Sequence, residues 1–483
     1  MSKAALSGKY AAYPEYKDSG VEWVGSIPSS WEMWKLSHAY ELIGSGTTPT
    51  SNNEKWFQGD IPWITTGELR ENIITDTTKK VSPLTIETFT ALKIYPKGSI
   101  AIAMYGATIG RLGILGVDAT TNQACCVMTK SKVLKNKYLF YWLQAFKDDI
   151  VQLSSGGGQP NINQEKVAAL KISAPVLKEQ TQIAAFLDHE TVKIDTLIEK
   201  QQQLIELLKE KRQAVISHAV TKGLNPDVPM KDSGVEWLGE VPAHWDITKF
   251  GYISSVVRGG SPRPAGDPTL FNGDYSPWVT VAEITKDNDI YLNQTETFLT
   301  KKGSDQCRVF QSGTLLLSNS GATLGVPKIL SIDANANDGV VGFENLQINS
   351  EFAYFYLSTL THNLRERIKQ GSGQPNLNTD IVKEISVPIP SSNEVKLIVN
   401  SIKETINRYS LLTSKAQDAI NLMQERRTAL ISAAVTGKID VRHFTLKDGI
   451  APTTNSDTNE AVQEAVQEAA QEAAQEAAQE AMA

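Results

Sequence analysis

The 483-residue sequence has few cysteines, no long apolar run and no excess of positive charge. Its three cysteines, Cys125, Cys126 and Cys307, have no metal-binding spacing and leave an odd thiol in any disulfide scheme, which favours a reducing compartment. No apolar run approaches the roughly 18 residues of a membrane helix, and the N-terminus lacks a signal-peptide pattern. We therefore expect a soluble, cytoplasmic protein without a membrane partner.

A net charge of -7, taken alone, argues against a polyanionic partner. However, residues 451–483 contain seven acidic residues and no Lys or Arg, so the rest of the chain is neutral. Phosphates respond to local charge, and a neutral body can still carry basic faces. Net charge therefore does not exclude nucleic acid.

The motifs of common enzymes are also missing. The stretch "GSGTTPT" (44–50) lacks the Gly-Lys-Ser/Thr ending of a phosphate-binding loop and the third glycine of a dinucleotide site. "NPDV" (225–228) only superficially resembles an amino-methyltransferase loop, and "EVK" (394–396) has no Pro-Asp partner of a nuclease site. The six histidines are scattered without zinc-ligand spacing. We expect no catalytic residue, no cofactor and no metal in this chain.

The sequence contains a long internal repeat. The heptapeptide "KDSGVEW" occupies residues 17–23 and returns at 231–237. Further pairs recur at a nearly constant offset: "PWITTGEL" (62–69) with "PWVTVAEI" (277–284), "GATIG" (106–110) with "GATLG" (321–325), and "GQPNIN" (158–163) with "GQPNLN" (373–378). A tandem duplication of this length predicts two similar domains, each followed by a similar connector.

Each copy combines short strands with helices. Apolar runs broken by Gly, Pro, Asn and Thr fill residues 35–130 and 249–349, which predicts strands and turns, while residues 137–153 and 352–368 read as amphipathic helices. We predict an α+β protein with two similar mixed globular domains, joined by two long antiparallel helices in a pseudo-two-fold circular arrangement. The predicted parts are two globular domains, two helical spacers and a tail: 1–174 and 224–389, 175–223 and 390–442, and 443–483.

The connectors contain neither Gly nor Pro over residues 178–220 and 391–436. In the first connector the apolar residues alternate at spacings of four and three when the intervening polar positions Glu190, Gln201 and Lys211 are counted, and the second connector repeats the pattern, which predicts a heptad seam between two helices. The predicted seam residues are Ile183, Leu187, Ile194, Leu197, Leu204, Leu208 and Val215, and Ile398, Ile402, Tyr409, Leu412, Ala419, Met423 and Leu430.

Neither long helix can bury its apolar stripe alone. Each helix packs either on its own globular domain or against the other helix as an antiparallel pair, and the sequence favours the pair. Such a pair would act as a ruler between the domains. A closed ring would also put residues near 440 beside residues near 15, which explains why the junction motif is needed twice.

Turn-rich segments recur at equivalent places: "GSGTTPTSN" with "RGGSPRPAG", "YGATIGR" with "NSGATLG", and "GGGQPN" with "GSGQPN". Glycines allow backbone amides to approach an anion, and Thr, Ser, Asn and Arg offer hydrogen bonds to phosphates or base edges. The alternative interpretation is that these segments are only tight turns. We expect Trp23, Trp31, Trp237 and Trp245 to be packing anchors rather than stacking platforms for bases.

Together these motifs resemble the specificity subunit of a type I restriction-modification system. The resemblance rests on "SGVEWVGSIPSSW" (19–31) and "SGVEWLGEVPAHW" (233–245), on "GGGQPNIN", on "PVLKEQTQIAAFLD" (175–188) and on "AVTGKIDVR" (434–442), and it covers residues 13–442. It implies two target recognition domains that each read half of a split double-stranded DNA site. It further implies two methyltransferase subunits that methylate adenine with S-adenosylmethionine, and two restriction subunits that use ATP and Mg.

The surface loops differ between the copies, for example "TPTSNNEKWFQ" (48–58) and "PRPAGDPTLFN" (262–272), which predicts an asymmetric target. We expect DNA contacts from Thr47, Thr48, Thr66, Tyr105, Thr108 and Arg111 in the first copy and from Arg258, Ser261, Arg263, Arg308, Asn319 and Thr323 in the second. "KEQ" (178–180) becomes "NEV" (393–395), so a partner contact there would differ between the copies.

Two rival functions remain: a DNA methyltransferase that acts alone, and a coiled-coil scaffold that binds no nucleic acid. The tail "QEAVQEAAQEAAQEAAQEA" (463–481) places glutamates four apart, where they repel one another. We expect a solvated tail that is partly helical or disordered.

Overall fold

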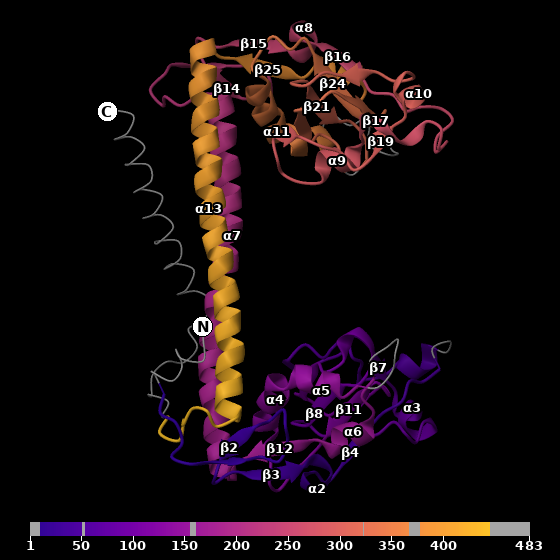
Figure 1. The fold of residues 1–483 in the computed structure, drawn as a ribbon, viewed down its shortest axis with the longest axis vertical. Helices are drawn as coiled ribbons and strands as arrows, with labels where there is room; N and C mark the ends of the chain where they lie inside the picture. Colours follow the sequence, from indigo (N-terminus) through magenta and orange to yellow (C-terminus); the bar gives the residue numbers. More distant parts are fainter. Residues whose placement is uncertain (1–9, 51–53, 155–160, 322, 367–376, 445–483) are drawn as a thin grey trace. The chain divides into compact units, whose positions relative to one another are not determined.

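The computed structural model describes residues 10–50, 54–154, 161–321, 323–366 and 377–444 (Figure 1). The chain divides into two compact units. Unit 1 comprises the described residues up to Ile198 and from Asn421 onward, and unit 2 comprises Glu199–Ile420. The predicted tail and most of both Gly-Gln-Pro-Asn loops lie outside the described residues.

Two long helices contribute to both units. Helix α7 spans Leu177–Lys222 and helix α13 spans Ser392–Val435, with 46 and 44 residues. The absence of Gly and Pro lets each helix run without interruption, and α7 ends directly before Gly223, which has φ +78°. The predicted α+β class with two long helices is confirmed.

A five-stranded sheet lies at the centre of unit 1, in the order β4-β11-β8-β9-β6. The strands are β4 (Ile43–Ser45), β11 (Cys125–Met128), β8 (Ile100–Ala103), β9 (Leu112–Leu115) and β6 (Asn72–Ile74). A second sheet contains β10 (Thr120–Thr121), β5 (Ile61–Ile64) and β7 (Lys80–Val81). The short helices are η1 (Glu54–Phe57), α3 (Pro83–Thr88), η2 (Gly106–Thr108), α2 (Leu36–Ala39), α4 (Asn136–Ala145), α5 (Lys147–Gln152) and α6 (Gln164–Ala169).

The central strands of this sheet are apolar on both faces because each face covers a separate core. Ile100 and Ile102 of β8 join the larger core, which includes the start of α7. Ala101 and Ala103 join the smaller core on the opposite face. The period of two along the strand therefore divides unit 1 into two packed layers.

Unit 2 repeats this plan. Its five-stranded sheet has the order β16-β24-β21-β22-β18, and a four-stranded sheet has the order β19-β17-β23-β20. The strands are β16 (Ser255–Arg258), β24 (Val340–Glu344), β21 (Leu315–Ser318), β22 (Pro327–Leu330), β18 (Tyr291–Leu292), β19 (Phe298–Leu299), β17 (Phe271–Val279), β23 (Ala334–Ala336) and β20 (Val309–Phe310). The helices are α8 (Phe250–Ile253), α9 (Val281–Thr285), α10 (Lys301–Ser304), α11 (Ser350–Glu366) and α12 (Thr379–Lys383).

Each copy of the heptapeptide belongs to a short hairpin that precedes the sheets of its unit. In unit 1, β1 (Tyr16–Asp18) pairs with β2 (Ser26–Pro28); in unit 2, β13 (Met230–Asp232) pairs with β14 (Glu240–Pro242). A two-stranded ladder follows in each, β3 (Glu32–Lys35) with β12 (Lys171–Ala174) and β15 (Asp246–Lys249) with β25 (Ser386–Ile389).

The two long helices contact each other within each unit. In unit 1 the first turns of α7 share a core with the last turns of α13, and Asp195 forms an ion pair with Arg427 at 2.9 Å. In unit 2 the last turns of α7, with Ile216, share a core with the first turns of α13, with Ile402. Both contacts have the order of an antiparallel pair, as predicted (Figure 1).

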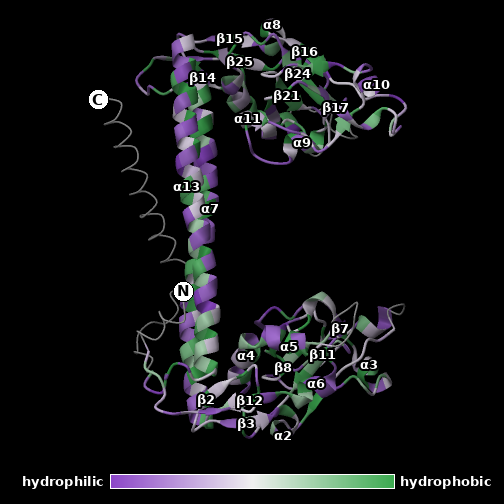
Figure 2. Ribbon diagram, in the orientation of Figure 1, coloured by the Kyte–Doolittle hydropathy of each residue, from purple (hydrophilic) through white to green (hydrophobic). Residues whose placement is uncertain are grey.

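Both helices also pack on the globular part of their unit, so the two predicted alternatives coexist. On α7, Asp188 accepts a hydrogen bond from the Tyr141 hydroxyl of α4 at 2.8 Å. On α13, Lys403 pairs with Glu351 of α11 at 2.5 Å. Figure 2 shows hydrophobic residues interleaved with hydrophilic ones along both helices.

The predicted seam is only partly correct. Ile183, Leu187, Ile194, Ile398, Ile402 and Leu430 are buried, and Leu204, Leu208, Val215, Tyr409, Ala419 and Met423 are half-buried. The prediction is wrong for Leu197 and Leu412, whose side chains are 51% and 40% exposed. Beside the half-buried Leu204, Val215 and Ala419, the next residue along the helix is buried in each case: Ile205, Ile216 and Ile420. Adjacent apolar residues such as Leu197 and Ile198 fit either alternation of fours and threes, and the partner helix selects between them.

Hydrogen bonds within unit 1 confirm the predicted proximity of residues near 440 and residues near 15. The Tyr16 hydroxyl donates to the Gly437 carbonyl at 2.9 Å, and Asp440 N–H donates to the Ala11 carbonyl at 2.7 Å. Gly437 has φ +68°, and an added Cβ would lie 2.3 Å from Pro28. The C-terminal segment therefore closes against the first hairpin within unit 1.

Candidate nucleic-acid interface

In unit 1 the turn-rich segments gather at one end of the central strands. Gly46 N–H, in the loop after β4, donates to Thr121 Oγ1 at 3.1 Å. Met104 N–H, directly after β8, donates to the Ala124 carbonyl at 2.8 Å, and its own carbonyl accepts Ile162 N–H at 3.0 Å. Three segments that lie far apart in the sequence therefore form one surface.

Unit 2 forms the equivalent cluster. Gly260 N–H donates to the Ala336 carbonyl, and Asn319 N–H donates to the Gly339 carbonyl, both at 2.9 Å. The Asn319 carbonyl accepts Leu377 N–H at 2.8 Å, as Met104 accepts Ile162 in unit 1.

Glycine is required where the loop passes over the turn. A Cβ on Gly46 would lie 1.7 Å from the Thr121 carbonyl oxygen, and a Cβ on Gly259 would lie 2.2 Å from the Asn337 carbonyl oxygen. Both distances are far below van der Waals contact, so any side chain would push the loop away. The recurring glycines therefore serve backbone packing, and the neighbouring polar residues supply the surface.

Most of the predicted DNA contacts lie on or beside these clusters. Thr48, Tyr105, Arg258 and Arg263 are exposed, and Thr47, Thr66, Thr108, Arg111, Ser261 and Thr323 are half-buried. Arg258 Nε donates to the Asp338 carbonyl at 2.6 Å, which fixes a cation at the unit 2 cluster. Contact of these residues with DNA stays a prediction.

Two of the predicted contacts need correction. Asn319 is 0% exposed, and among the described residues its side-chain amide has no hydrogen-bond partner, so the buried amide does not present itself to a base. The guanidinium of Arg308 forms an ion pair with Glu344, at the opposite end of β24 from the cluster. The sequence did not indicate the burial of Asn319 or the ion pair of Arg308, because both depend on where the ends of the strands lie in the folded unit.

The Lys-Glu-Gln motif of residues 178–180 serves the fold. Glu179 accepts hydrogen bonds from the Tyr13 hydroxyl at 2.6 Å and from Trp31 Nε1 at 3.0 Å. The buried Gln180 side chain accepts from Lys135 N–H at 2.7 Å and donates to two backbone carbonyls. Burial and the Glu179 carboxylate raise the pKa of Tyr13 well above its usual value. The side chains of Glu179 and Gln180 therefore form their hydrogen bonds within unit 1.

The second copy keeps only part of this arrangement. Glu394 accepts from Trp245 Nε1 at 3.2 Å and from His244 Nε2 at 3.0 Å. Burial opposes ionisation of Glu394, but the hydrogen bonds from His244, Trp245 and the Ser391 backbone together hold its pKa below the usual value. Trp31 and Trp245 are fully buried, which confirms that these two are packing anchors.

The two thiols of β11 are poor nucleophiles because they are buried and neutral. Cys125 and Cys126 are consecutive on β11 and buried in the two different cores, and burial raises the pKa of Cys126 to about 12. The thiols are therefore neutral at ordinary pH. Within the part of the chain that the structure describes, no group of three His, Cys, Asp or Glu side chains could hold a metal ion.

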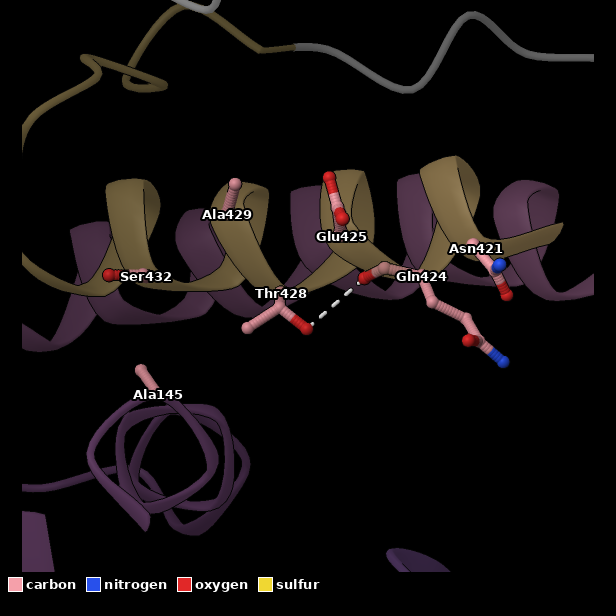
Figure 3. Close-up of a pocket in the computed structure, with 7 residues that line it drawn as sticks. All are labelled: Ala145, Asn421, Gln424, Glu425, Thr428, Ala429 and Ser432. Carbon is pink, nitrogen blue, oxygen red and sulfur yellow. Dashed lines mark hydrogen bonds between the residues drawn. The ribbon is translucent and has the colours of Figure 1, made fainter. Parts of the chain in front are cut away.

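A groove of about 790 Å³ runs beside α13 in unit 1 (Figure 3). Ala145 of α4 forms one wall, and the other lining residues are Asn421, Gln424, Glu425, Thr428, Ala429 and Ser432 of α13. The Thr428 hydroxyl donates to the Gln424 carbonyl at 3.1 Å. All but Ala145 are surface residues of one helix, and the groove is open to solvent rather than enclosed by converging walls as a small-molecule site is.

None of the helices in the described ranges is long and apolar enough to span a membrane.

Comparison with known proteins adds to this geometry. The family described as "Type I restriction modification DNA specificity domain" matches residues 28–207 and 242–422. The type I restriction enzyme MjaVIII specificity subunit of Methanocaldococcus jannaschii is 22% identical over 438 residues, which cover 86% of this chain and 95% of the relative. The MjaIX specificity subunit of the same organism is 23% identical over 458 residues, covering 90% and 99%.

Solved structures have the same fold. The HsdS subunit from Thermoanaerobacter tengcongensis superimposes with a TM-score of 0.52 at 14% identity, covering 86% of this chain and 98% of that chain. A chain from a structure on complex assembly and conformational transition of the type I R-M system gives a TM-score of 0.68 at 14% identity, covering 86% and 99%. The two family matches include most of the residues from the first hairpin to the end of α13. The chain belongs to the type I restriction modification DNA specificity domain family and carries two copies of that domain in tandem.

Proposed function

We propose that this chain is the DNA specificity subunit of a type I restriction-modification complex, and that each unit reads one half of a split target. The observation that carries the proposal is the repeated loop cluster. Each family match contains one such cluster, in which Met104 or Asn319 makes equivalent backbone contacts and the surrounding side chains differ. Because the two clusters have equivalent backbones but different side chains, we expect them to recognise two different half-sites.

The residues proposed to contact DNA are now those of the two clusters. In unit 1 they are Thr47, Thr48, Thr66, Tyr105, Thr108 and Arg111, and in unit 2 they are Arg258, Ser261, Arg263 and Thr323. Hydroxyl groups and arginines bind phosphates and base edges.

Catalysis in the complex belongs to partner subunits. We propose two methyltransferase subunits that methylate adenine with S-adenosylmethionine, and two restriction subunits that use ATP and Mg. The long helices would hold the spacing between half-sites, since a 46-residue helix is about 69 Å long at about 1.5 Å per residue.

The test is to produce the chain with its methyltransferase subunits and to map methylated adenines in DNA. We expect one asymmetric, split target. Exchange of residues 45–130 for those of another specificity subunit should change one half-site only, and altered recognition in both halves would contradict independent units.

Two outcomes would favour the rivals. Methyl transfer by the purified chain alone, measured with labelled S-adenosylmethionine, would indicate a self-sufficient methyltransferase. Failure of the complex to bind any DNA at low salt, where phosphate contacts are strongest, would indicate a scaffold.

A further inference from the structure

One turn is built identically in both units. It joins β10 to β11 in unit 1 and β23 to β24 in unit 2. In each turn an asparagine, Asn122 or Asn337, donates its N–H to a carbonyl of the neighbouring strand at 2.9 Å. The Oδ1 of the same asparagine accepts the N–H two residues further on at 3.1 Å. Backbone and asparagine therefore hold the residue after each asparagine in the same place.

That residue differs between the units. It is Gln123 in unit 1, where it is exposed, and Asp338 in unit 2, where it is half-buried. Both side chains belong to the loop clusters, because the turns supply the carbonyls of Ala124 and Gly339 that receive Met104 and Asn319.

A hydroxyl from the facing loop orients each side chain. The Thr48 hydroxyl donates to Gln123 Oε1, and the Ser261 hydroxyl donates to Asp338 Oδ1 at 2.8 Å. Thr48 and Ser261 are equivalent. Thr48 lies three residues after Ser45, which pairs with β11, and Ser261 lies three residues after Arg258, which pairs with β24. In both units, therefore, a hydroxyl group of the facing loop donates to a side-chain oxygen of the residue after the asparagine.

The hydroxyl occupies one end of each side chain and leaves the other end for a ligand. Among hydrogen bonds between described residues, neither Gln123 Nε2 nor Asp338 Oδ2 takes part in one. Unit 1 therefore offers an amide donor at the place where unit 2 offers a carboxylate acceptor. Arg258, whose Nε donates to the Asp338 carbonyl, puts a cation beside that carboxylate and offsets its repulsion from phosphates.

We propose that Gln123 and Asp338 are specificity-determining residues at equivalent places in the two units. This inference rests on the proposed DNA-recognition function. Asp338 accepts from a base that has an exocyclic amino group in the major groove, cytosine or adenine. Gln123 donates to a base that presents an acceptor there, such as guanine O6 or thymine O4. The two half-sites then differ at the equivalent base, because one unit reads an acceptor and the other a donor.

The experiment selects bound duplexes from a random library, using the full chain in complex with its methyltransferase subunits. Asp338→Asn replaces an acceptor by an amide that also donates. We expect preference for the amino-bearing base to fall about five- to 150-fold at one position of one half-site. Gln123→Glu should change one position in the other half-site. Ser261→Ala should weaken discrimination at the Asp338 position without moving it.

Asp333→Asn is the matched control. Asp333 precedes β23 at its opposite end, where its Oδ1 accepts Ser312 N–H at 2.8 Å. This variant should retain the wild-type target. If Asp338→Asn and Gln123→Glu also select the wild-type target unchanged, the inference is rejected and the proposed function stands. If the wild-type complex itself selects no split target, the proposed function fails.

Discussion

Removal of the Glu179 carboxylate should open the junction of unit 1. Glu179 is 8% exposed and accepts from two buried donors, the Tyr13 hydroxyl and Trp31 Nε1. Glu179→Ala leaves both donors without a partner, at about 1–3 kcal/mol each. We expect a local cost of about 2–6 kcal/mol.

Glu394 of unit 2 provides the comparison. Its side chain is 33% exposed, its partner His244 is 49% exposed and can turn to water, and its hydrogen bonds with Ser391 are exposed as well. Only Trp245 Nε1 then loses a partner in the interior, so Glu394→Ala should cost about 1–3 kcal/mol.

The assay is amide hydrogen exchange followed by mass spectrometry, which reports local opening free energies. In Glu179→Ala, peptides from residues 10–31 should lose protection by about 30-fold or more, since about 1.4 kcal/mol corresponds to a factor of ten. Peptides from residues 230–245 should lose less in Glu394→Ala. Glu179→Gln keeps an acceptor of the same shape and should lie between wild type and Glu179→Ala. An equal or larger loss of protection in Glu394→Ala would refute the reasoning.

Three further predictions concern the long helices α7 and α13 and the hydrogen bonds of Glu394 in unit 2. Ile205→Ala, at a buried seam position, should lower the free energy of unfolding by about 2 kcal/mol or more, whereas Leu197→Ala should change it by about 0.5 kcal/mol at most; equal losses in denaturant titrations would contradict the observed seam. The folded-state pKa of Glu394 is lowered, so its stabilisation is present above its unfolded-state pKa of 4.5 and disappears as pH falls through the lower folded value. The acid-side loss of protection in residues 230–245 should therefore be smaller in Glu394→Gln than in wild type, and an identical pH profile would exclude this contribution. Insertion of seven residues into both helices, after Gln201 and after Ala419, keeps the heptad and adds about 10 Å, or about three base pairs, so the mapped spacer should grow by three; an unchanged spacer would reject the ruler.

The sequence by itself determined the plan of this protein. Two copies of one unit, their short strands and the two long helices follow from recurring motifs and from where Gly and Pro are present or missing. Such features depend on neighbours in the chain, and local propensity and periodicity report them directly. The proximity of residues near 15 and near 440 also followed, because the junction motif occurs once per unit and each copy needs a helix end before it.

Tertiary structure decided the details that depend on contacts between distant residues. Leu197 and Ile198 are equally apolar, and only the facing turn of α13 selects which of them turns inward. Glu179 finds Trp31 across 148 positions of sequence, so its use inside the fold could not be read from the Lys-Glu-Gln motif. Gln123 and Asp338 were missed for the same reason, although the aligned turns "TNQA" and "ANDG" were a usable signal. Periodicity fixes which residues share a face of an element, but the identity of the opposing face is a property of the packed molecule.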